Sequence, residues 1–348
     1  MKSKNIKINK NNNFALLHLA AAAMVVYGHS YSVLNMVAPE VLGTAIHTLA
    51  LEILFIVSGF LVTKSMARTK KIYEYYGKRI MRLWPGLLFC LLGTVIILFF
   101  LRTGSVEAYG KSALYYFRKN ALFSPEFYMK GLFPNNPYAR VINGSLWSLP
   151  VELACYLVLP LFLWKVKGKK KAALSVSLLI YLVFGLGALA YERDVFTADL
   201  IFYGTNWKYM ITLGVYFFSG AFYASIDNKV LKSVWNSIAA VLVIAAVIYF
   251  RDRYLTVYNI VLLPYLVISL GNFFRAPASG FFNRLDAAYG IYLWGFLFQQ
   301  ITVYVMMRHN IALKPVSVFV CSMVLTAAAA ALQKVLIEKP VAEILQKI

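Results

Sequence analysis

The sequence has few charged residues for its length, and this shortage excludes most soluble proteins. Asp, Glu, Lys and Arg together make up 14% of its 348 residues, whereas a soluble domain typically carries about 25%. Hydrophobic residues make up 61% of the chain, and no polar stretch is long enough to form a separate soluble domain. We therefore predict an integral membrane protein with a single domain over residues 1–348.

Acidic residues and cysteines are also scarce. The chain holds 14 acidic residues against 35 basic ones, a formal net charge of +21. On a soluble protein this excess would suggest nucleic-acid binding. Here the basic residues gather between apolar runs, as expected of loops beside anionic lipid, so we expect membrane lipids and no nucleic acid as partners. The cysteines Cys90, Cys155 and Cys321 lie inside apolar runs, which predicts packed thiols, no disulfide and no metal site.

The apolar runs are long enough to cross a bilayer, which takes about 20 residues of helix. They are too long and too evenly apolar for the strands of a barrel. The predicted fold class is an all-α integral membrane bundle of about ten transmembrane helices. We find no internal repeat, which disfavours transporters built from duplicated halves. The predicted spans are 14–36, 44–63, 84–101, 145–164, 172–190, 209–226, 234–250, 254–274, 287–307 and 315–336.

The distribution of Lys and Arg predicts the orientation of these spans. Basic residues concentrate in the segments 1–13, 64–82 and 165–171, and such segments stay on the cytoplasmic side of a membrane. Both termini are then cytoplasmic. The segment 1–13 lacks a small-residue cleavage site, so we expect a basic cytoplasmic tail that precedes a retained first helix.

The longest connection, 102–143, is then extracytoplasmic and rich in Tyr, Phe and Pro. It could be an interfacial helix and loop that lie on the outer leaflet, anchored by aromatic residues. It could also be a lid that binds an acceptor and offers aromatic platforms to a sugar. The two interpretations are compatible.

Ionisable residues at membrane depth are the first candidates for function, because burying one costs about 2.5–3.5 kcal/mol on insertion scales. The only acidic residues inside the predicted spans are Glu52 and Glu152, and the histidines there are His18, His29 and His47. Counting along the spans places His29, Glu52 and Glu152 at comparable depths in the outer half. His18 and His29 are eleven residues apart and share a helix face. Each of these residues could instead bond a neighbouring helix structurally, and we favour that role for His47.

The fourth predicted span combines several polar residues. Ser145, Ser148 and Glu152 share one helical face by their spacing, and Trp147 is expected at the outer interface. In other spans, the small residues Gly28 and Gly59 predict close packing of helices.

A pair of arginines precedes the third span. Arg79 and Arg82 are three residues apart and face the same way on a helix. Two guanidinium groups there could clamp a phosphate. Alternatively, they could anchor the protein to lipid headgroups on the cytoplasmic side.

Several segments in this order resemble the membrane-bound acyltransferase 3 family. The resemblance covers nearly the whole chain, and the joint order of the segments is more specific than any one of them. The segments are HLAAAAMVVYGHSYSV (18–33), LEILFIVSGFLVT (51–63), KRIMRLWPG (78–86), NGSLWSLPVELACYLVLP (143–160), YFFSGAFYA (216–224), DAAYGIYLWGFLFQQ (286–300) and Glu338-Lys339-Pro340.

The resemblance implies a ten-helix enzyme of the bacterial plasma (inner) membrane. Such an enzyme takes an acyl group, commonly acetyl, from cytoplasmic acyl-coenzyme A and passes it to a hydroxyl of an extracytoplasmic carbohydrate. Acyl-coenzyme A is a co-substrate, and no permanently bound cofactor is implied. The oligomeric state is left open.

The resemblance also assigns residues. His29 matches the family's first-helix histidine, and Arg79 and Arg82 match its basic pair, which implies donor binding. The family has Arg where this chain has His18, so His18 is a donor contact that lacks a permanent charge.

The resemblance and the predicted depths together suggest how the site would work. His29 would act as a general base or form an acyl-imidazole. Glu152 or Glu52 would orient it or bind the acceptor, and Ser145 would stabilise the oxyanion.

Two other classes of function fit the same membrane residues. A proton-coupled transporter or flippase for a sugar or an anion could use Glu52, Glu152 and His29 as a proton relay. A scaffold for lipid-linked complexes is the third class. Acceptor-dependent release of free coenzyme A would distinguish an enzyme from both.

Overall fold

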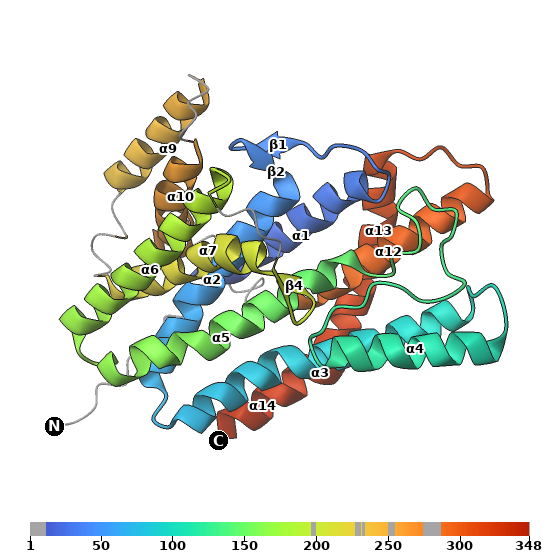
Figure 1. Ribbon diagram of the computed structural model, residues 1–348, viewed down its shortest axis with the longest axis horizontal. Helices are drawn as coiled ribbons and strands as arrows, with labels where there is room; N and C mark the ends of the chain where they lie inside the picture. The colour runs from blue at the N-terminus through green and yellow to red at the C-terminus, as the bar shows by residue number, and fades with distance from the viewer. Residues whose placement is uncertain are drawn as a thin grey trace.

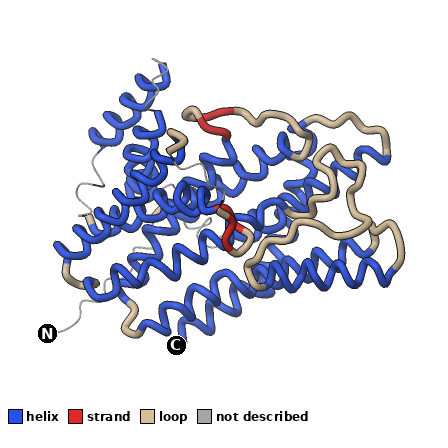
Figure 2. The backbone as a smooth tube through the Cα atoms, in the orientation of Figure 1, coloured by secondary structure: helices blue, strands red, loops and turns tan. Residues whose placement is uncertain are grey.

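The computed structural model describes residues 12–195, 200–226, 231, 234–249, 255–273 and 287–347, and this part of the chain is mainly helical (Figures 1 and 2). The α-helices are α1 (Phe14–Ser32), α2 (Ile46–Arg68), α3 (Ile72–Phe99), α4 (Val106–Ala121), α5 (Leu149–Leu163), α6 (Lys170–Glu192), α7 (Trp207–Ser225), α9 (Val234–Tyr249), α10 (Leu255–Phe273), α12 (Ala288–Arg308), α13 (Pro315–Gln333) and α14 (Lys339–Lys347). Two 3-10 turns, η1 (Gly144–Ser148) and η2 (Trp164–Val166), flank α5, and a π-helical turn, η3 (Lys334–Glu338), joins α13 to α14.

Seven helical stretches in the described ranges are long and apolar enough to cross a membrane. They are α1, α2, α3, Gly144–Val166, α6, α12 and Pro315–Leu345. The other three predicted spans, 209–226, 234–250 and 254–274, coincide with α7, α9 and α10, of which α9 has 16 residues. The all-α membrane architecture is confirmed. The count of ten spans and the side of each terminus stay predictions, and the tail up to residue 11 lies outside the described residues.

The helix α12 forms the centre of the bundle. Within its apolar stretch 78% of the residues are buried, more than in any other candidate span of the described chain. It packs against α1, α3, α13 and η1. Side chains on every face of α12 therefore meet other helices, which lets it position polar groups between them.

The predicted outer connection 102–143 contains one regular helix, α4, which runs back along α3 (Figure 1). The Trp84 indole N–H donates to the carbonyl of Ala121 at 3.0 Å, and the Tyr109 hydroxyl donates to the carbonyl of Val95 at 2.5 Å. Burial raises the pKa of Tyr109 to about 12 although the Arg102 guanidinium opposes the shift, so this hydroxyl keeps its proton and remains a donor.

The end of the same connection is fastened to α12 by Gln300, which is fully buried. Its amide nitrogen donates to the carbonyls of Tyr138 and Val141, each at 2.8 Å, and its amide oxygen accepts from Asn136 at 2.7 Å. Because one side chain serves three partners, the segment 136–141 has a fixed position over α12.

Two short hairpins have the same construction. Strands β1 (Glu40–Val41) and β2 (Thr44–Ala45) lead into α2, and β3 (Ile201–Phe202) and β4 (Thr205–Asn206) lead into α7. Both turns hold two consecutive residues at positive φ, namely Leu42 (54°) and Gly43 (71°) in the first and Tyr203 (52°) and Gly204 (73°) in the second. Two such residues with a glycine are typical of type I′ turns.

The helices that follow the two hairpins also match and cross at corresponding glycines. Gly43 and Gly204 are 204 − 43 = 161 residues apart, and so are Gly59 and Gly220 (220 − 59 = 161). A Cβ on Gly59 would meet the carbonyl of Phe217, and one on Gly220 would meet the carbonyl of Ile56. Since 217 − 56 is again 161, the contact is reciprocal. The expectation that the chain lacks an internal repeat is therefore wrong for these two hairpin–helix units, whose sequences share little beyond Gly-Thr and Ser-Gly.

Candidate functional site

A cavity of about 650 Å³ lies between α1, α2, α3, α5, α12 and the C-terminal turn and helix. Most of its wall is apolar, but one group of lining residues is basic and comes from the end of α2, the first turns of α3 and the start of η3. We call this group the basic end of the cavity; its members are Arg68, Lys78, Arg79, Arg82 and Lys334.

The two predicted donor-binding arginines line this cavity and are held by hydroxyl and aromatic groups. Arg79 donates to the Ser65 hydroxyl at 3.4 Å, and its guanidinium lies 5.8 Å from the ring centre of Tyr156. Arg82 lies 5.7 Å from the ring centre of Tyr289. The rings favour the charged guanidinium groups through their electron-rich faces and limit how far they can move.

His18 lines the same cavity from α1, as the donor-contact prediction requires. The face of α1 that His18 and His29 share is not open to the cavity between these two residues. Between the two histidines, Ala22 and Val25 are 0% and 1% exposed and belong to apolar clusters. Any route from the cavity toward His29 therefore runs along another wall.

That other wall is formed by Tyr292 and Ser148, which both line the cavity. The Tyr292 hydroxyl donates to the carbonyl of Ser145 at 2.7 Å and lies 2.5 Å from the Ser148 hydroxyl. The Ser145 hydroxyl in turn lies 3.5 Å from Nδ1 of His29. One residue of η1, Ser145, therefore separates the cavity wall from His29.

His29 is buried, with 8% of its surface exposed. Its ring packs 5.3 Å from that of His47 and 5.4 Å, edge on, from that of Phe296. A Cβ on Gly28 would meet His47, so the glycine gives the close approach of α1 and α2 that its sequence position predicts.

The start of the fourth predicted span holds its polar residues in register. Residues 144–148 form a 3-10 turn, which repeats every three residues, so Ser145 and Ser148 stay on one face although the turn is not α-helical. The buried Asn143 caps this turn, because its side-chain oxygen accepts from the Ser145 N–H at 3.1 Å and its amide donates to the Leu293 carbonyl at 2.7 Å.

Glu152 also lines the cavity, one α-helical turn beyond Ser148. The Ser58 hydroxyl donates to its carboxylate at 3.4 Å, the Tyr156 hydroxyl donates to the same oxygen, and the two hydroxyls lie 2.9 Å apart. Glu152 therefore belongs to the wall of the cavity, on the same side of Ser145 as Ser148 and Tyr292.

Two other residues singled out in the sequence, Glu52 and Trp147, lie elsewhere. Glu52 is buried on α2, and its carboxyl group interacts with Tyr216 of α7. It does not line the cavity, although Leu51 beside it does. The Trp147 ring packs 4.6 Å from that of Tyr209 at the start of α7. The structure thus brings His18, Arg79, Arg82 and Glu152 to one cavity. It places Ser145 and then His29 behind the wall formed by Tyr292 and Ser148, and neither Glu52 nor Trp147 lines the cavity.

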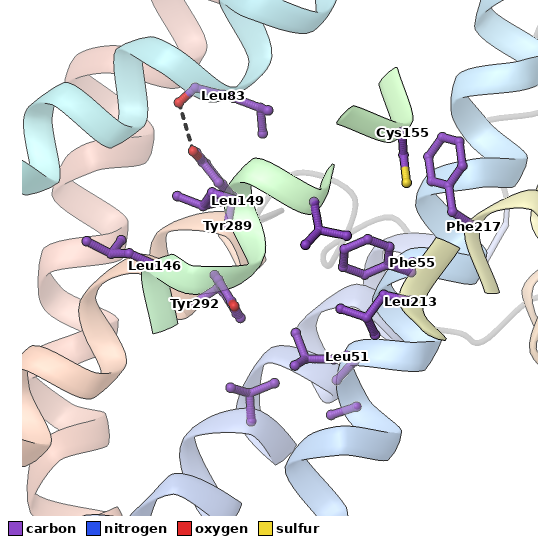
Figure 3. Close-up of a cluster of buried hydrophobic side chains, with 14 of the residues drawn as sticks. Leu51, Phe55, Leu83, Leu146, Leu149, Cys155, Leu213, Phe217, Tyr289 and Tyr292 are labelled. Atoms are coloured by element: carbon purple, nitrogen blue, oxygen red, sulfur yellow. Dashed lines mark hydrogen bonds between the residues drawn. The ribbon is translucent and has the colours of Figure 1, made fainter. Parts of the chain in front are cut away.

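Sequence reasoning assigned no role to Tyr292, Asn143 or Glu338. Figure 3 shows Tyr292 beside Leu146 and Leu149, with Tyr289 donating to the Leu83 carbonyl. The signals were present: an Asn two residues before a Ser is a typical cap, and Glu338 is an acidic residue beside an apolar run.

Comparison with known proteins gives the chain its family. The family model described as an acyltransferase domain, that of the acyltransferase 3 family, matches residues 12–332. Similar proteins include an O-acetyl transferase of Shigella phage Sf6, 27% identical over 307 residues that cover 85% of this chain and 87% of the relative. Another is nodulation protein 10 of Rhizobium leguminosarum bv. viciae, 34% identical over 181 residues, or 48% of each chain. No solved structure matches the chain. With a match over nearly its whole length and several helices apolar enough to span a membrane, the protein is a multi-pass acyltransferase that belongs to the acyltransferase 3 family.

Proposed function

We propose that the protein is an O-acyltransferase of the bacterial plasma membrane that moves an acyl group, acetyl in the first instance, from cytoplasmic acyl-coenzyme A to a hydroxyl of an extracytoplasmic carbohydrate. The family and the relative named as an O-acetyl transferase support the reaction type. The carbohydrate acceptor is inferred from the resemblance of the motif segments. The long connection 102–143 would then face that acceptor.

One observation carries the proposal: a cavity that is basic at one end reaches a wall only one residue away from a buried histidine. Its volume of about 650 Å³ falls within the range of small-molecule sites, which run from about 300 to 1,000 Å³. The basic end suits the phosphates of coenzyme A. The largely apolar remainder suits its pantetheine arm, whose thioester would then lie near Ser148 and Tyr292.

The chemistry follows from the surroundings of His29. As general base its Nε2 must be unprotonated, so Nδ1 carries the proton and donates to the Ser145 hydroxyl. Nε2 takes the proton of the acceptor hydroxyl while the hydroxyl oxygen attacks the thioester carbon. The carbon–sulfur bond then breaks, and the coenzyme A thiolate receives the proton from His29. In the covalent route the acyl group would rest on Nε2 before the hydroxyl attacks.

Arg79, Arg82 and His18 would bind the donor in this scheme. By the resemblance, His18 stands where the family carries a guanidinium, and an imidazole there offers a hydrogen bond without a permanent charge. The phosphate attraction then falls on Arg79, Arg82 and the neighbouring lysines of the basic end. Glu152, held by Ser58 and Tyr156, would fix the wall along which the pantetheine arm lies.

The test compares His29→Ala with His309→Ala in purified full-length protein, using radiolabelled acetyl-coenzyme A and host-membrane saccharides. His309 is exposed beyond the end of α12 and serves as the matched control. We expect His29→Ala to lower acceptor-dependent release of coenzyme A by about 10²–10⁴-fold, the usual contribution of a general base. Transfer at the rate of the control would remove His29 from the mechanism. Proton-driven solute uptake without any acyl transfer would favour a transporter.

A further inference from the structure

The carboxylate of Glu338, in the π-helical turn η3, lines the cavity next to Arg82 and Lys334 of the basic end. Its side chain is 8% exposed. A buried carboxylate among basic residues is stabilised by their charge, but it also occupies positions that another anion could take.

The contacts of Glu338 show which positions these are. One carboxylate oxygen lies 3.7 Å from the Arg82 guanidinium and 3.2 Å from the Lys334 ammonium. The other oxygen accepts from the Gln333 amide at 3.0 Å. Gln333 is fully buried and itself accepts from the Trp294 indole at 2.9 Å, so this half of the arrangement is fixed to α12.

We propose that Glu338 is an internal counter-anion at the phosphate site and that Lys334 is a further cation of that site. A phosphate group of the incoming donor replaces the carboxylate on Arg82 and Lys334, and the carboxylate returns when the product leaves. The identity of the donor as an acyl-coenzyme A rests on the proposed function. The exchange itself requires only a phosphate ester or a pyrophosphate.

The charges favour this exchange. Guanidinium groups bind carboxylates and phosphates through the same N–H donors, and a phosphate monoester carries more charge than a carboxylate. At 3.7 Å the Arg82 contact is an ion pair longer than a good hydrogen bond, so a phosphate that approaches closely gains more from Arg82 than Glu338 does.

The local backbone provides for the movement of Glu338. Residues 334–338 form a π-helical turn, a rare geometry that occurs mostly as single turns and is frequent at functional sites. The helix α14 that follows supplies Val341, Ala342 and Leu345 to the cavity wall. A shift of Glu338 would therefore be transmitted to a helix that contacts the donor.

The test measures the affinity of full-length protein in detergent for coenzyme A and for inorganic pyrophosphate. Glu338→Gln removes the charge but keeps an oxygen that can accept from Gln333, and we expect it to tighten both ligands about fivefold. We expect Lys334→Gln to weaken both about fivefold. The matched controls are Glu343→Gln and Lys339→Gln, exposed residues of α14 outside the cavity lining, which should leave both affinities unchanged.

A second measurement uses the wild-type protein and does not depend on the folding of a variant. Saturation with coenzyme A should change amide hydrogen exchange in residues 334–345, because the ligand displaces Glu338. Unchanged exchange there, or a Glu338→Gln variant that binds coenzyme A as Glu343→Gln does or more weakly than wild type, would overturn the inference. Failure of the wild-type protein to bind coenzyme A at all would instead contradict the proposed function.

Discussion

The crossing of α2 and α7 allows a packing prediction with a definite size. Gly59 and Gly220 let the two helices approach until backbone meets backbone. We expect Gly59→Ala to destabilise the protein. Its new Cβ would lie 2.8 Å from the carbonyl carbon of Phe217, with the carbonyl oxygen nearer still. Ordinary contact begins at 3.4 Å, so the helices would have to separate by more than 3.4 − 2.8 = 0.6 Å.

Two opposing terms set the net effect. Overpacking of a close contact costs about 1–3 kcal/mol, and the obstacle here is rigid backbone. The better helix propensity of Ala returns about 1 kcal/mol. If the overpacking term lies at the upper end of its range, the net loss is about 2 kcal/mol. The reciprocal contact predicts a similar loss for Gly220→Ala.

The assay is thermal unfolding of detergent-purified full-length protein, with Gly110→Ala as the matched control. Gly110 lies inside α4, and nothing stands within 4 Å of its added Cβ. The control should therefore gain stability from the propensity term alone. A Gly59→Ala variant as stable as Gly110→Ala would refute the reasoning, because the close contact would then cost nothing.

Two further predictions concern polar groups held by α12. Tyr292→Phe leaves the Ser145 carbonyl and the Ser148 hydroxyl without their shared partner. We therefore expect kcat to fall about tenfold with little change in the donor KM, whereas a Tyr304→Phe control on the same helix should keep both values. An effect confined to the donor KM would contradict a role beside His29. Gln300→Leu removes three hydrogen bonds to the segment 136–141. It should lower the free energy of unfolding by about 3 kcal/mol and expose that segment to limited proteolysis. The control Met306→Leu, a volume-conserving change in the apolar cluster that contains Val141, should do neither.

Helix positions could be predicted well from this sequence, because in a membrane the length of an apolar run fixes the length of the helix. The prediction for the fourth span, 145–164, matches η1 and α5 to within one residue at each end. The third helix begins at Ile72, whereas the predicted span began at residue 84. The prediction missed the first turns because they carry polar residues, some of which line the basic end. Hydropathy alone cannot distinguish such turns from a loop.

Lateral placement could not be predicted, because helical spacing gives depth and face but not the identity of the neighbouring helix. His29 and Glu152 were expected at similar depths, but the residue of that span that lies next to His29 is Ser145, whose hydroxyl is 3.5 Å from Nδ1 of His29. Glu52 and Glu152 are both acidic residues inside predicted spans, yet Glu52 lies beside Tyr216 of α7 and does not line the cavity. Glu338 stands out in the sequence as an acidic residue beside an apolar run, but its ion pair with Arg82 of α3 could not be predicted, because the two residues are far apart in the chain.

The two matched hairpin–helix units share one backbone arrangement, but the surroundings of α2 and α7 differ. Leu61 and Val62 of α2 border the cavity, and their counterparts 161 positions on (222 − 61 = 161) are Phe222 and Tyr223. Those rings pack against the rings of Tyr181 and Tyr265, at centre distances of 5.8 and 6.2 Å. The cavity therefore lies beside α2, whereas aromatic side chains fill the corresponding space beside α7. Trimming those rings to small residues should therefore open a second chamber, which would resemble the first in outline but lack its arginines.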